Sequence, residues 1–241
     1  MSRLWLIFGA VSASIAILIT ALALWRMFDF RTRWHGLWVN SQWEQTLEQE
    51  GLFADHTIIF FGDSQLALWR MAPSFGRLPI RNRGISGDQA IHALRRFEQD
   101  SLAYQPDLIL FLMGTNDLAR QTPIDEIVAA LKSMVDAART QGASVLIGSI
   151  LPVAPQQGPI RDPAKIIQLN QQLQALADRD LVEFIDFHAQ LVDESGWMNP
   201  QYTDDGLHPN ESGYAKMTQL LTPRLAQVLT GNNAHDQGAL N

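Results

Sequence analysis

The chain has 241 residues, of which 46% are hydrophobic and 18% charged, values that suit a globular protein rather than a disordered one. It contains no cysteine, which excludes disulfides, cysteine nucleophiles and thiolate metal ligands. Four arginines and one aspartate give residues 1–33 a charge of +3, so the remainder carries −10 of the net charge of −7. An acidic body argues against a nucleic-acid partner, because phosphates select basic surfaces.

The N-terminal segment differs in character from the rest. Residues 4–25, LWLIFGAVSASIAILITALALW, form a run of 22 residues without a charge. A helix of that length reaches about 33 Å, enough to cross a bilayer core of roughly 30 Å. Trp5 and Trp25 lie near its ends, where aromatic residues favour the membrane interface. The run predicts a single-pass transmembrane anchor at 1–25, with the membrane as a partner.

A cleaved signal peptide is the alternative for this segment, since the sequence ALA near its end fits the small-x-small cleavage pattern. In that case the body would be secreted. For an uncleaved anchor, three arginines follow the run and one precedes it. The positive-inside rule then weakly favours a cytoplasmic body, and this small difference leaves the side of the membrane open.

Residues 26–50 form a tryptophan-rich connector. Trp34 and Trp38 have helical spacing, and Trp43 follows among polar residues. One face of the connector could rest on the membrane surface or pack against the body, and packing is the preferred interpretation.

Beyond Gly51, short apolar runs alternate with segments of helical periodicity, which predicts one α/β domain over 51–230 with a parallel sheet covered on both faces. The predicted strands lie at 57–61, 79–82, 107–113, 144–150 and 182–187. The predicted helices lie at roughly 88–103, 123–141, 163–179 and 210–229. The segment 152–163, with four prolines, is a loop, and the tail 231–241 is expected to be mobile.

Polar motifs follow several of the predicted strands. GDSQ with Ser64 follows the first, RGISGD with Gly84 the second and GTND with Asn116 the third, while DDGLHPN lies beyond the fifth. Ligands of an open parallel sheet bind beyond the carboxyl ends of its strands. We therefore expect these motifs to meet at one edge of the sheet, although GDSQ or GTND alone is more often a turn, and DGLHPN alone fits a turn with a helix cap as well as a catalytic pair.

The residue types in these motifs fit nucleophilic catalysis. A serine hydroxyl such as Ser64 needs a base to remove its proton, and the base needs an orienting carboxylate. Asp205 and His208 are three residues apart, a spacing that brings a carboxylate to Nδ1 on a tight loop. The N–H groups of Ser64 and Gly84 and the amide of Asn116 could then stabilise an oxyanion.

Four stretches, FFGDSQ, NRGISGD, MGTND and YTDDGLHPNESGY, resemble in order the four sequence blocks of the SGNH hydrolases, also called the GDSL esterase/lipase family. The resemblance spans about residues 57–225. It implies that Ser64 is the nucleophile, His208 the base and Asp205 its partner, with an oxyanion hole formed by Ser64, Gly84 and Asn116. It also implies a flavodoxin-like three-layer sandwich with a parallel five-stranded sheet and no cofactor. No metal is expected either, because no histidine or carboxylate stands at metal-ligand spacing.

The expected function is a serine esterase that acts on short acyl esters, since NRGISGD resembles most the acetylhydrolase-like and bacterial acylesterase members. A lysophospholipase or thioesterase that takes lipids from the nearby membrane is the alternative. A non-catalytic binding protein on the same fold is a rival of another class, and the intact set of site residues weighs against it. The expected partner is therefore a small ester or lipid substrate, and the oligomeric state is left open.

Overall fold

The computed structural model describes residues 56–76, 78–177 and 181–238, which all belong to one compact unit of the chain, residues 44–241. The predicted anchor or signal peptide at 1–25 and the connector at 26–50 lie outside the described residues. Among the residues that are described, no helix combines the length and the apolar character needed to cross a bilayer. Membrane attachment and the side of the body stay predictions.

Within the described ranges, one sheet of five parallel strands has the order β2-β1-β3-β4-β5. The three inner strands are buried along their whole length, as expected for strands covered on both faces. The predicted parallel five-stranded sheet is therefore confirmed. The strands are β1 (Ile58–Gly62), β2 (Ile80–Gly84), β3 (Leu108–Leu112), β4 (Ser144–Gly148) and β5 (Val182–Ile185).

The four helices predicted from periodicity are confirmed as α4 (Ala90–Asp100), α6 (Ile124–Thr140), α7 (Pro163–Leu176) and α9 (Glu211–Gly238). Shorter elements were not predicted, because one or two turns are too short to show a helical period. These are α2 (Ser64–Ala67), α3 (Met71–Phe75), α5 (Thr115–Ala119), α8 (His188–Leu191), and the 3₁₀ turns η1 (Leu102–Tyr104), η2 (Pro155–Gln157) and η3 (Pro200–Tyr202).

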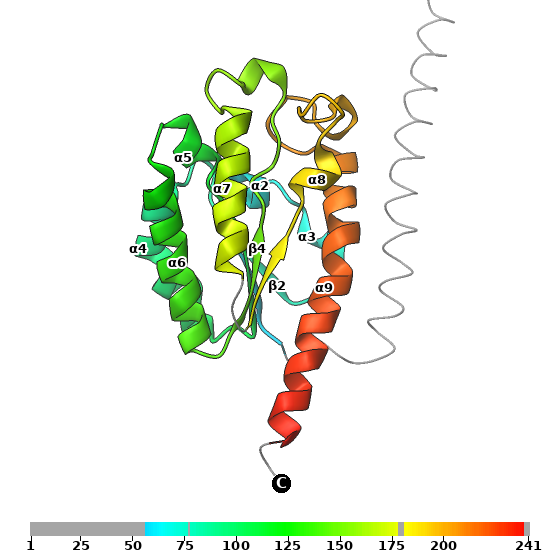
Figure 1. The fold of residues 1–241 in the computed structure, drawn as a ribbon. Coiled ribbons are helices and arrows are strands. Elements are labelled where there is room, and N and C mark those ends of the chain that lie inside the picture. The colour runs from blue at the N-terminus through cyan, green and yellow to red at the C-terminus, as the bar shows by residue number, and fades with distance from the viewer. Residues whose placement is uncertain (1–55, 77, 178–180, 239–241) are drawn as a thin grey trace, which may run out of the picture. The chain divides into compact units, whose positions relative to one another are not determined.

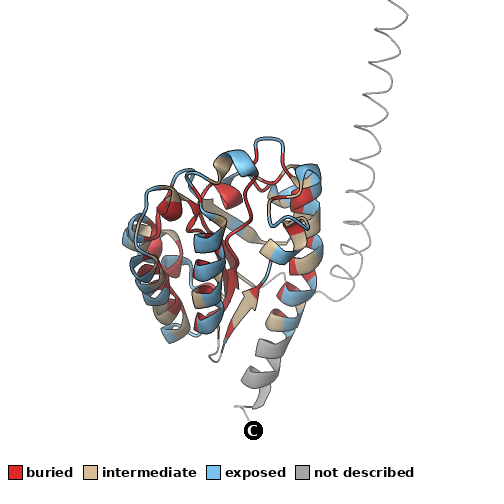
Figure 2. Ribbon diagram, turned by 45° about the horizontal axis from the view of Figure 1, so that its top comes forward, coloured by how far each residue is buried: buried red, intermediate tan, exposed pale blue. Residues whose placement is uncertain are grey.

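The helices form layers on both faces of the sheet (Figure 1). Successive side chains of a strand point to opposite faces, so Ile59 and Phe61 belong to the core beneath α4, α6 and α7, whereas Ile58 and Phe60 belong to the core beneath α3, α8 and α9. Figure 2 shows the same division, with buried strands between helices whose outer sides are exposed. The three-layer α/β architecture is the one predicted.

The last helix is longer than predicted. Helix α9 continues to Gly238, so the first part of the tail 231–241 is helical. The helical periodicity predicts an end near 229, but the helix runs on through Gly231, and one glycine inside a helix costs only about 1 kcal/mol. The expected mobility of the tail stays a prediction.

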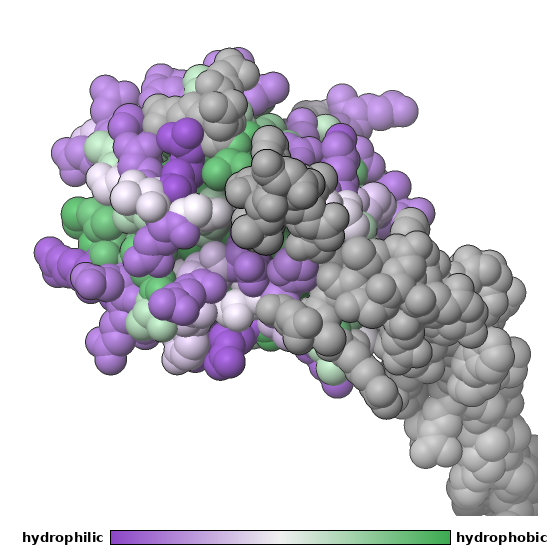
Figure 3. All heavy atoms as spheres, turned by 90° about the horizontal axis from the view of Figure 1, so that it is seen from below, coloured by the Kyte–Doolittle hydropathy of each residue, from purple (hydrophilic) through white to green (hydrophobic). Residues whose placement is uncertain are grey.

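The two ends of the sheet differ in the loops they carry. The carboxyl ends of the strands and the loops that follow them lie at the top of Figure 1. On the opposite end, seen in Figure 3, hydrophilic side chains predominate on the visible described surface. The polar motifs GDSQ, RGISGD and GTND follow the carboxyl ends of β1, β2 and β3, so they lie at the end of the sheet that carries these loops.

An aromatic cluster anchors the segment that follows α2. Trp69 is 1% exposed and packs against four rings at centroid distances between 5.4 and 6.1 Å. Its indole Nε1–H donates to Ser74 Oγ at 3.0 Å. The four rings are those of Phe60 on β1, Phe75 on α3, Phe187 directly before α8, and Tyr214 on α9.

Replacement of Trp69 by alanine should lower the free energy of unfolding by about 3–5 kcal/mol, because it removes a fully buried ring and leaves a cavity. Urea unfolding followed by circular dichroism measures this loss. The neighbouring Leu68 is 51% exposed, so Leu68→Ala should change the same quantity by less than about 0.5 kcal/mol. Similar losses in the two variants would contradict the packing described.

Candidate active site

Ser64 is presented by the turn that ends β1. Asp63 adopts an extended conformation as the N-cap of α2, and its Oδ1 accepts the N–H of Gln65 at 2.9 Å. Ser64 is the first residue of that helix, where backbone N–H groups have no intrahelical acceptor. The GDSQ motif is thus both a helix cap and the element that holds the hydroxyl at the end of the sheet.

Asp205, His208 and Ser64 form a hydrogen-bonded chain. Oδ2 of Asp205 lies 2.7 Å from Nδ1 of His208, and Nε2 of His208 lies 2.9 Å from Oγ of Ser64. In this arrangement an imidazole can accept the hydroxyl proton while the carboxylate holds its orientation. The sequence motifs predict that these three residues meet, and the structure brings them together.

The loop that carries His208 is fixed by local hydrogen bonds. Thr203 Oγ1 accepts the N–H of Gly206 at 2.9 Å and donates to the carbonyl of His208 at 2.8 Å. Asn210 Oδ1 accepts the N–H of Gly213 at 3.1 Å in the first turn of α9. The imidazole therefore stands on a loop that is tied at both ends.

Asp205 is held in its ionised form. Partial burial alone would raise the pKa of Asp205, but hydrogen bonds from the imidazole of His208 and from the N–H groups of His208 and Leu207 outweigh it and lower the pKa to about 2. Both N–H groups lie 2.8 Å from Oδ1. The carboxylate can therefore stabilise a protonated imidazole at neutral pH.

Asn116 lies in the first turn of α5, directly beyond β3. Its Nδ2 donates to the carbonyl of Asp88 at 3.1 Å, which uses one of the two amide hydrogens. The other hydrogen is available for a ligand. Together with the N–H of Ser64, this amide gives the site two donors of the kind that an oxyanion requires.

The N–H of Gly84, expected from the sequence to face an oxyanion, has a different partner in the structure. It donates to Oδ1 of Asn82 at 2.9 Å, so this donor is already occupied. A Cβ at this position would lie 2.3 Å from the backbone nitrogen of Ala67. Close packing against α2, rather than the approach of a substrate, therefore explains the glycine.

Gly87 is a backbone donor that sequence reasoning missed. It occupies the third position of the turn Ile85–Asp88, in which Asp88 N–H donates to the carbonyl of Ile85 at 3.2 Å. Its φ of +80° is the conformation that this turn position reserves for glycine. Its N–H has no acceptor within the described part of the chain. The second glycine of RGISGD, at the third position of a turn, was the available signal.

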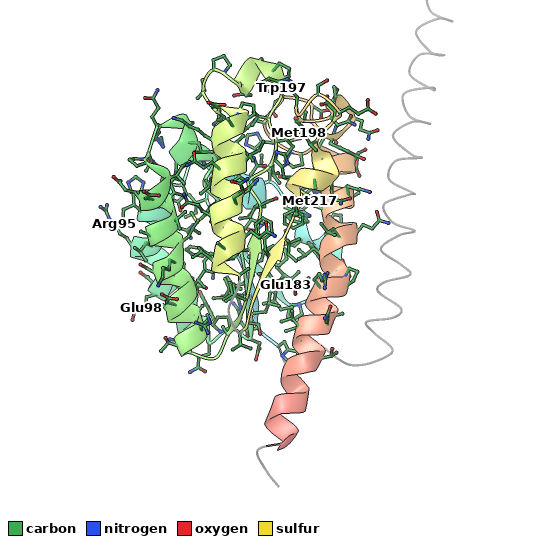
Figure 4. All side chains as sticks on the ribbon, in the orientation of Figure 1. Arg95, Glu98, Glu183, Trp197, Met198 and Met217 are labelled. Atoms are coloured by element: carbon green, nitrogen blue, oxygen red, sulfur yellow. The ribbon has the colours of Figure 1, made fainter. Side chains whose placement is uncertain are left out.

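Two further loops flank the histidine. Ala154 N–H donates to the carbonyl of Gly206 at 2.8 Å, and Met198 N–H donates to the carbonyl of Val153 at 2.9 Å. Trp197 and Met198 lie among the loops at the upper end of the molecule (Figure 4). The proline-rich segment 152–163 therefore lies directly beside the Asp205–His208 loop. Within the described ranges no three His, Asp or Glu side chains group as metal ligands.

The carboxyl group of Asp63, next to Ser64, is fully buried. Burial raises the pKa of Asp63 to about 7, despite hydrogen bonds that act in the opposite direction. Its Oδ2 has no hydrogen-bond partner among the described residues. The group therefore resists ionisation, unlike the exposed Asp205.

Comparison with known proteins shows the family of the chain. The model of the GDSL-like Lipase/Acylhydrolase family matches residues 60–216. The chain is 28% identical over 183 residues to platelet-activating factor acetylhydrolase IB subunit alpha2 of Rattus norvegicus, covering 71% of this chain and 77% of that protein. It is 28% identical to an arylesterase of Vibrio mimicus over 62% of this chain and 71% of that protein.

A solved structure has the same fold. A GDSL-like lipase from Bacteroides thetaiotaomicron superposes with a TM-score of 0.67 at 29% identity, covering 77% of this chain and 97% of that one. The chain belongs to the GDSL-like lipase/acylhydrolase family. It is a hydrolase that acts on ester bonds.

The raised pKa of Asp63 predicts a pH-dependent stability. Between about pH 4 and 7 the folded carboxyl keeps a proton that the unfolded one has lost, so this group reduces the free energy of unfolding as the pH rises through that window. Asparagine keeps the acceptor for the Gln65 N–H and has no proton to lose. Between pH 4 and 7, the free energy of unfolding of Asp63→Asn should therefore rise relative to that of the unmodified chain by about 1.4 kcal/mol for each pH unit. Urea unfolding at several pH values measures it, and a pH-independent difference would contradict the assignment.

Proposed function

We propose that the protein is a serine esterase in which Ser64, His208 and Asp205 act as nucleophile, general base and orienting carboxylate. The observation that carries this proposal is the hydrogen-bonded chain from carboxylate through imidazole to hydroxyl, with distances of 2.7 and 2.9 Å. Ser64 is 7% exposed and lies at the end of the sheet where ligands of such folds bind.

In the first half of the reaction, Oγ of Ser64 attacks the ester carbonyl carbon while its proton passes to Nε2 of His208. The tetrahedral intermediate then collapses, the bond from carbon to the alcohol oxygen breaks, and the alcohol leaves with the proton from His208. Asp205 stabilises the imidazolium through both steps and stays ionised, in keeping with its low pKa.

In the second half, water attacks the acyl-enzyme and gives one proton to Nε2 of His208. Collapse of the second intermediate breaks the bond between the acyl carbon and Oγ of Ser64, and the proton returns to that oxygen. The acid is released and the starting state is restored.

We assign the oxyanion hole to the N–H of Ser64, the N–H of Gly87 and the side-chain amide of Asn116. Each has a hydrogen with no acceptor within the described residues. Gly84, the donor expected from the sequence, would have to leave Asn82 Oδ1 to take part. Its role in this proposal is to let the chain pass close to α2.

The proposed substrates are esters of short acyl groups. This rests on relatives whose names are an acetylhydrolase and an arylesterase. Long-chain lysophospholipids or thioesters are the second candidate, favoured by the uncharged run at 4–25, which we propose places the enzyme at a membrane.

Ser64→Ala should abolish turnover of p-nitrophenyl esters by the full chain, because no other group replaces the attacking oxygen. A series of acyl lengths from acetate to palmitate measures the specificity, and a fluorophosphonate probe should label the unmodified chain but not the variant. A maximum at short chains supports the short-acyl esterase, and a maximum at long chains supports the lipid hydrolase. A folded unmodified chain with neither turnover nor labelling would reject the serine-esterase proposal.

Asn116→Ala should lower kcat by about 10²- to 10³-fold with little change in KM, because a donor aimed at the oxyanion stabilises the transition state more than the bound ester. Steady-state kinetics on the preferred p-nitrophenyl ester measure both constants. Gln99→Ala removes an exposed amide on α4 and serves as the matched control, with kinetics unchanged. An unchanged kcat in Asn116→Ala would remove this amide from the proposed hole.

A further inference from the structure

The side chain of Arg96 on α4 points into the protein rather than to solvent. It is 17% exposed, and its guanidinium carbon lies 4.2 Å from the ring centroid of Phe61 on β1. Stacking on an aromatic face is a favourable position for a guanidinium, and it leaves the N–H edges free to bond in the plane.

Every nitrogen of this guanidinium has a partner. Nε donates to Asp88 Oδ2 at 2.9 Å, and Nη2 lies 2.8 Å from the same oxygen. Nη2 also donates to the carbonyls of Gly62 and Arg83, each at 3.1 Å. Nη1 donates to Asp100 Oδ2 at 3.1 Å on the outer side. Four of its five N–H groups thus bond within the protein, and the fifth belongs to Nη1, the nitrogen that pairs with Asp100.

The partners of Arg96 belong to the segments that carry the proposed oxyanion donors. Gly62 ends β1, two residues before Ser64, and the carbonyl of Arg83 lies at the end of β2, before the turn that holds Gly87. The backbone carbonyl of Asp88 accepts the amide of Asn116. One guanidinium therefore connects all three segments.

We propose that Arg96 is a positioning residue that sets the geometry of the oxyanion hole, an inference that rests on the proposed serine-esterase function. The carbonyl of Gly62 also accepts the N–H of Ile85, so Arg96 is the second donor that holds it. The planar fork of Arg96 binds this carbonyl, the carbonyl of Arg83 and the buried carboxylate of Asp88 at fixed relative positions. An oxyanion hole needs its donors held to within about 0.5 Å, which this connection supplies.

Arg96→Lys tests the proposal, because lysine keeps the charge but cannot span the same acceptors. In the full chain, kcat per folded molecule should fall at least about tenfold while KM changes by less than about threefold, since misplaced donors weaken the transition state more than ester binding. Arg96→Gln should lose more. Asp88→Asn cuts the same ion pair but keeps the backbone carbonyl that holds Asn116, and its kcat should fall similarly.

Two variants serve as controls on the same helix. Arg95 points away from the body (Figure 4), so Arg95→Lys should leave both constants unchanged. The side chain of Asp100 is 35% exposed and forms the outer ion pair of Arg96. Asp100→Asn removes this pair and should lower the melting temperature without lowering kcat. Circular dichroism gives the folded fraction by which each rate is divided.

A double-mutant cycle separates positioning from general stability. If Arg96 acts through the oxyanion donors, Arg96→Lys in an Asn116→Ala background should cost clearly less than it does alone, because one of the positioned donors is already missing. If the fold-loss in kcat of the double variant equals the product of the losses in the two single variants, the residues act independently and the proposal is overturned. The proposal is also overturned by an unchanged kcat per folded molecule, or by loss of folding in all three of Arg96→Lys, Arg96→Gln and Asp88→Asn, which would assign the network to stability.

The outcome for the proposed function is read separately. An unmodified chain that neither turns over esters nor reacts with a fluorophosphonate rejects the serine esterase and this inference with it. An active unmodified chain with a fully active Arg96→Lys variant rejects the positioning role alone and leaves the esterase proposal standing.

Discussion

The order of the strands is the constraint on which the site depends. β1 lies between β2 and β3, and Gly62 at its end is in register with Gly84 on one side and Leu112 on the other. Asp63 N–H donates to the carbonyl of Leu112, and Ile85 N–H donates to the carbonyl of Gly62. The loops after all three strands are thus tied to one another within a residue or two of the sheet. Any ligand at Ser64 meets the loops after β2 and β3 at once.

The buried carboxyl groups of Asp63, Asp88 and Asp117 at this edge of the sheet each accept a hydrogen bond from the protein. Asp117 accepts the N–H of Ala90 at 3.1 and 3.2 Å and so caps α4 from another segment, although burial raises the pKa of Asp117 to about 6. Asp88 is paired with Arg96. Asp205, by contrast, is exposed and readily ionised. The same residue type therefore holds loops where it is buried and orients a histidine where it is accessible.

Local sequence patterns were sufficient for the strands and the long helices, since their periods and apolar runs extend over enough residues to be read. They were insufficient for α2 and α5, which are short and carry Ser64 and Asn116. RGISGD illustrates the limit more sharply. Its position after a strand was evident, but which glycine has a free N–H depends on the side chain of Asn82 and on a positive φ at Gly87. Neither is encoded in the spacing of the motif.

The sequence by itself determined the class of fold, the motifs that follow the strands, and the pairing of Asp205 with His208, because that pairing spans three residues of one tight loop. Only the tertiary structure decided that His208 reaches Ser64 across 144 positions of the chain, and that Arg96 joins the ends of β1 and β2. The physical reason is that such contacts depend on strand order and register. These follow from the burial of the whole sheet between its helices and not from any local preference of the residues involved.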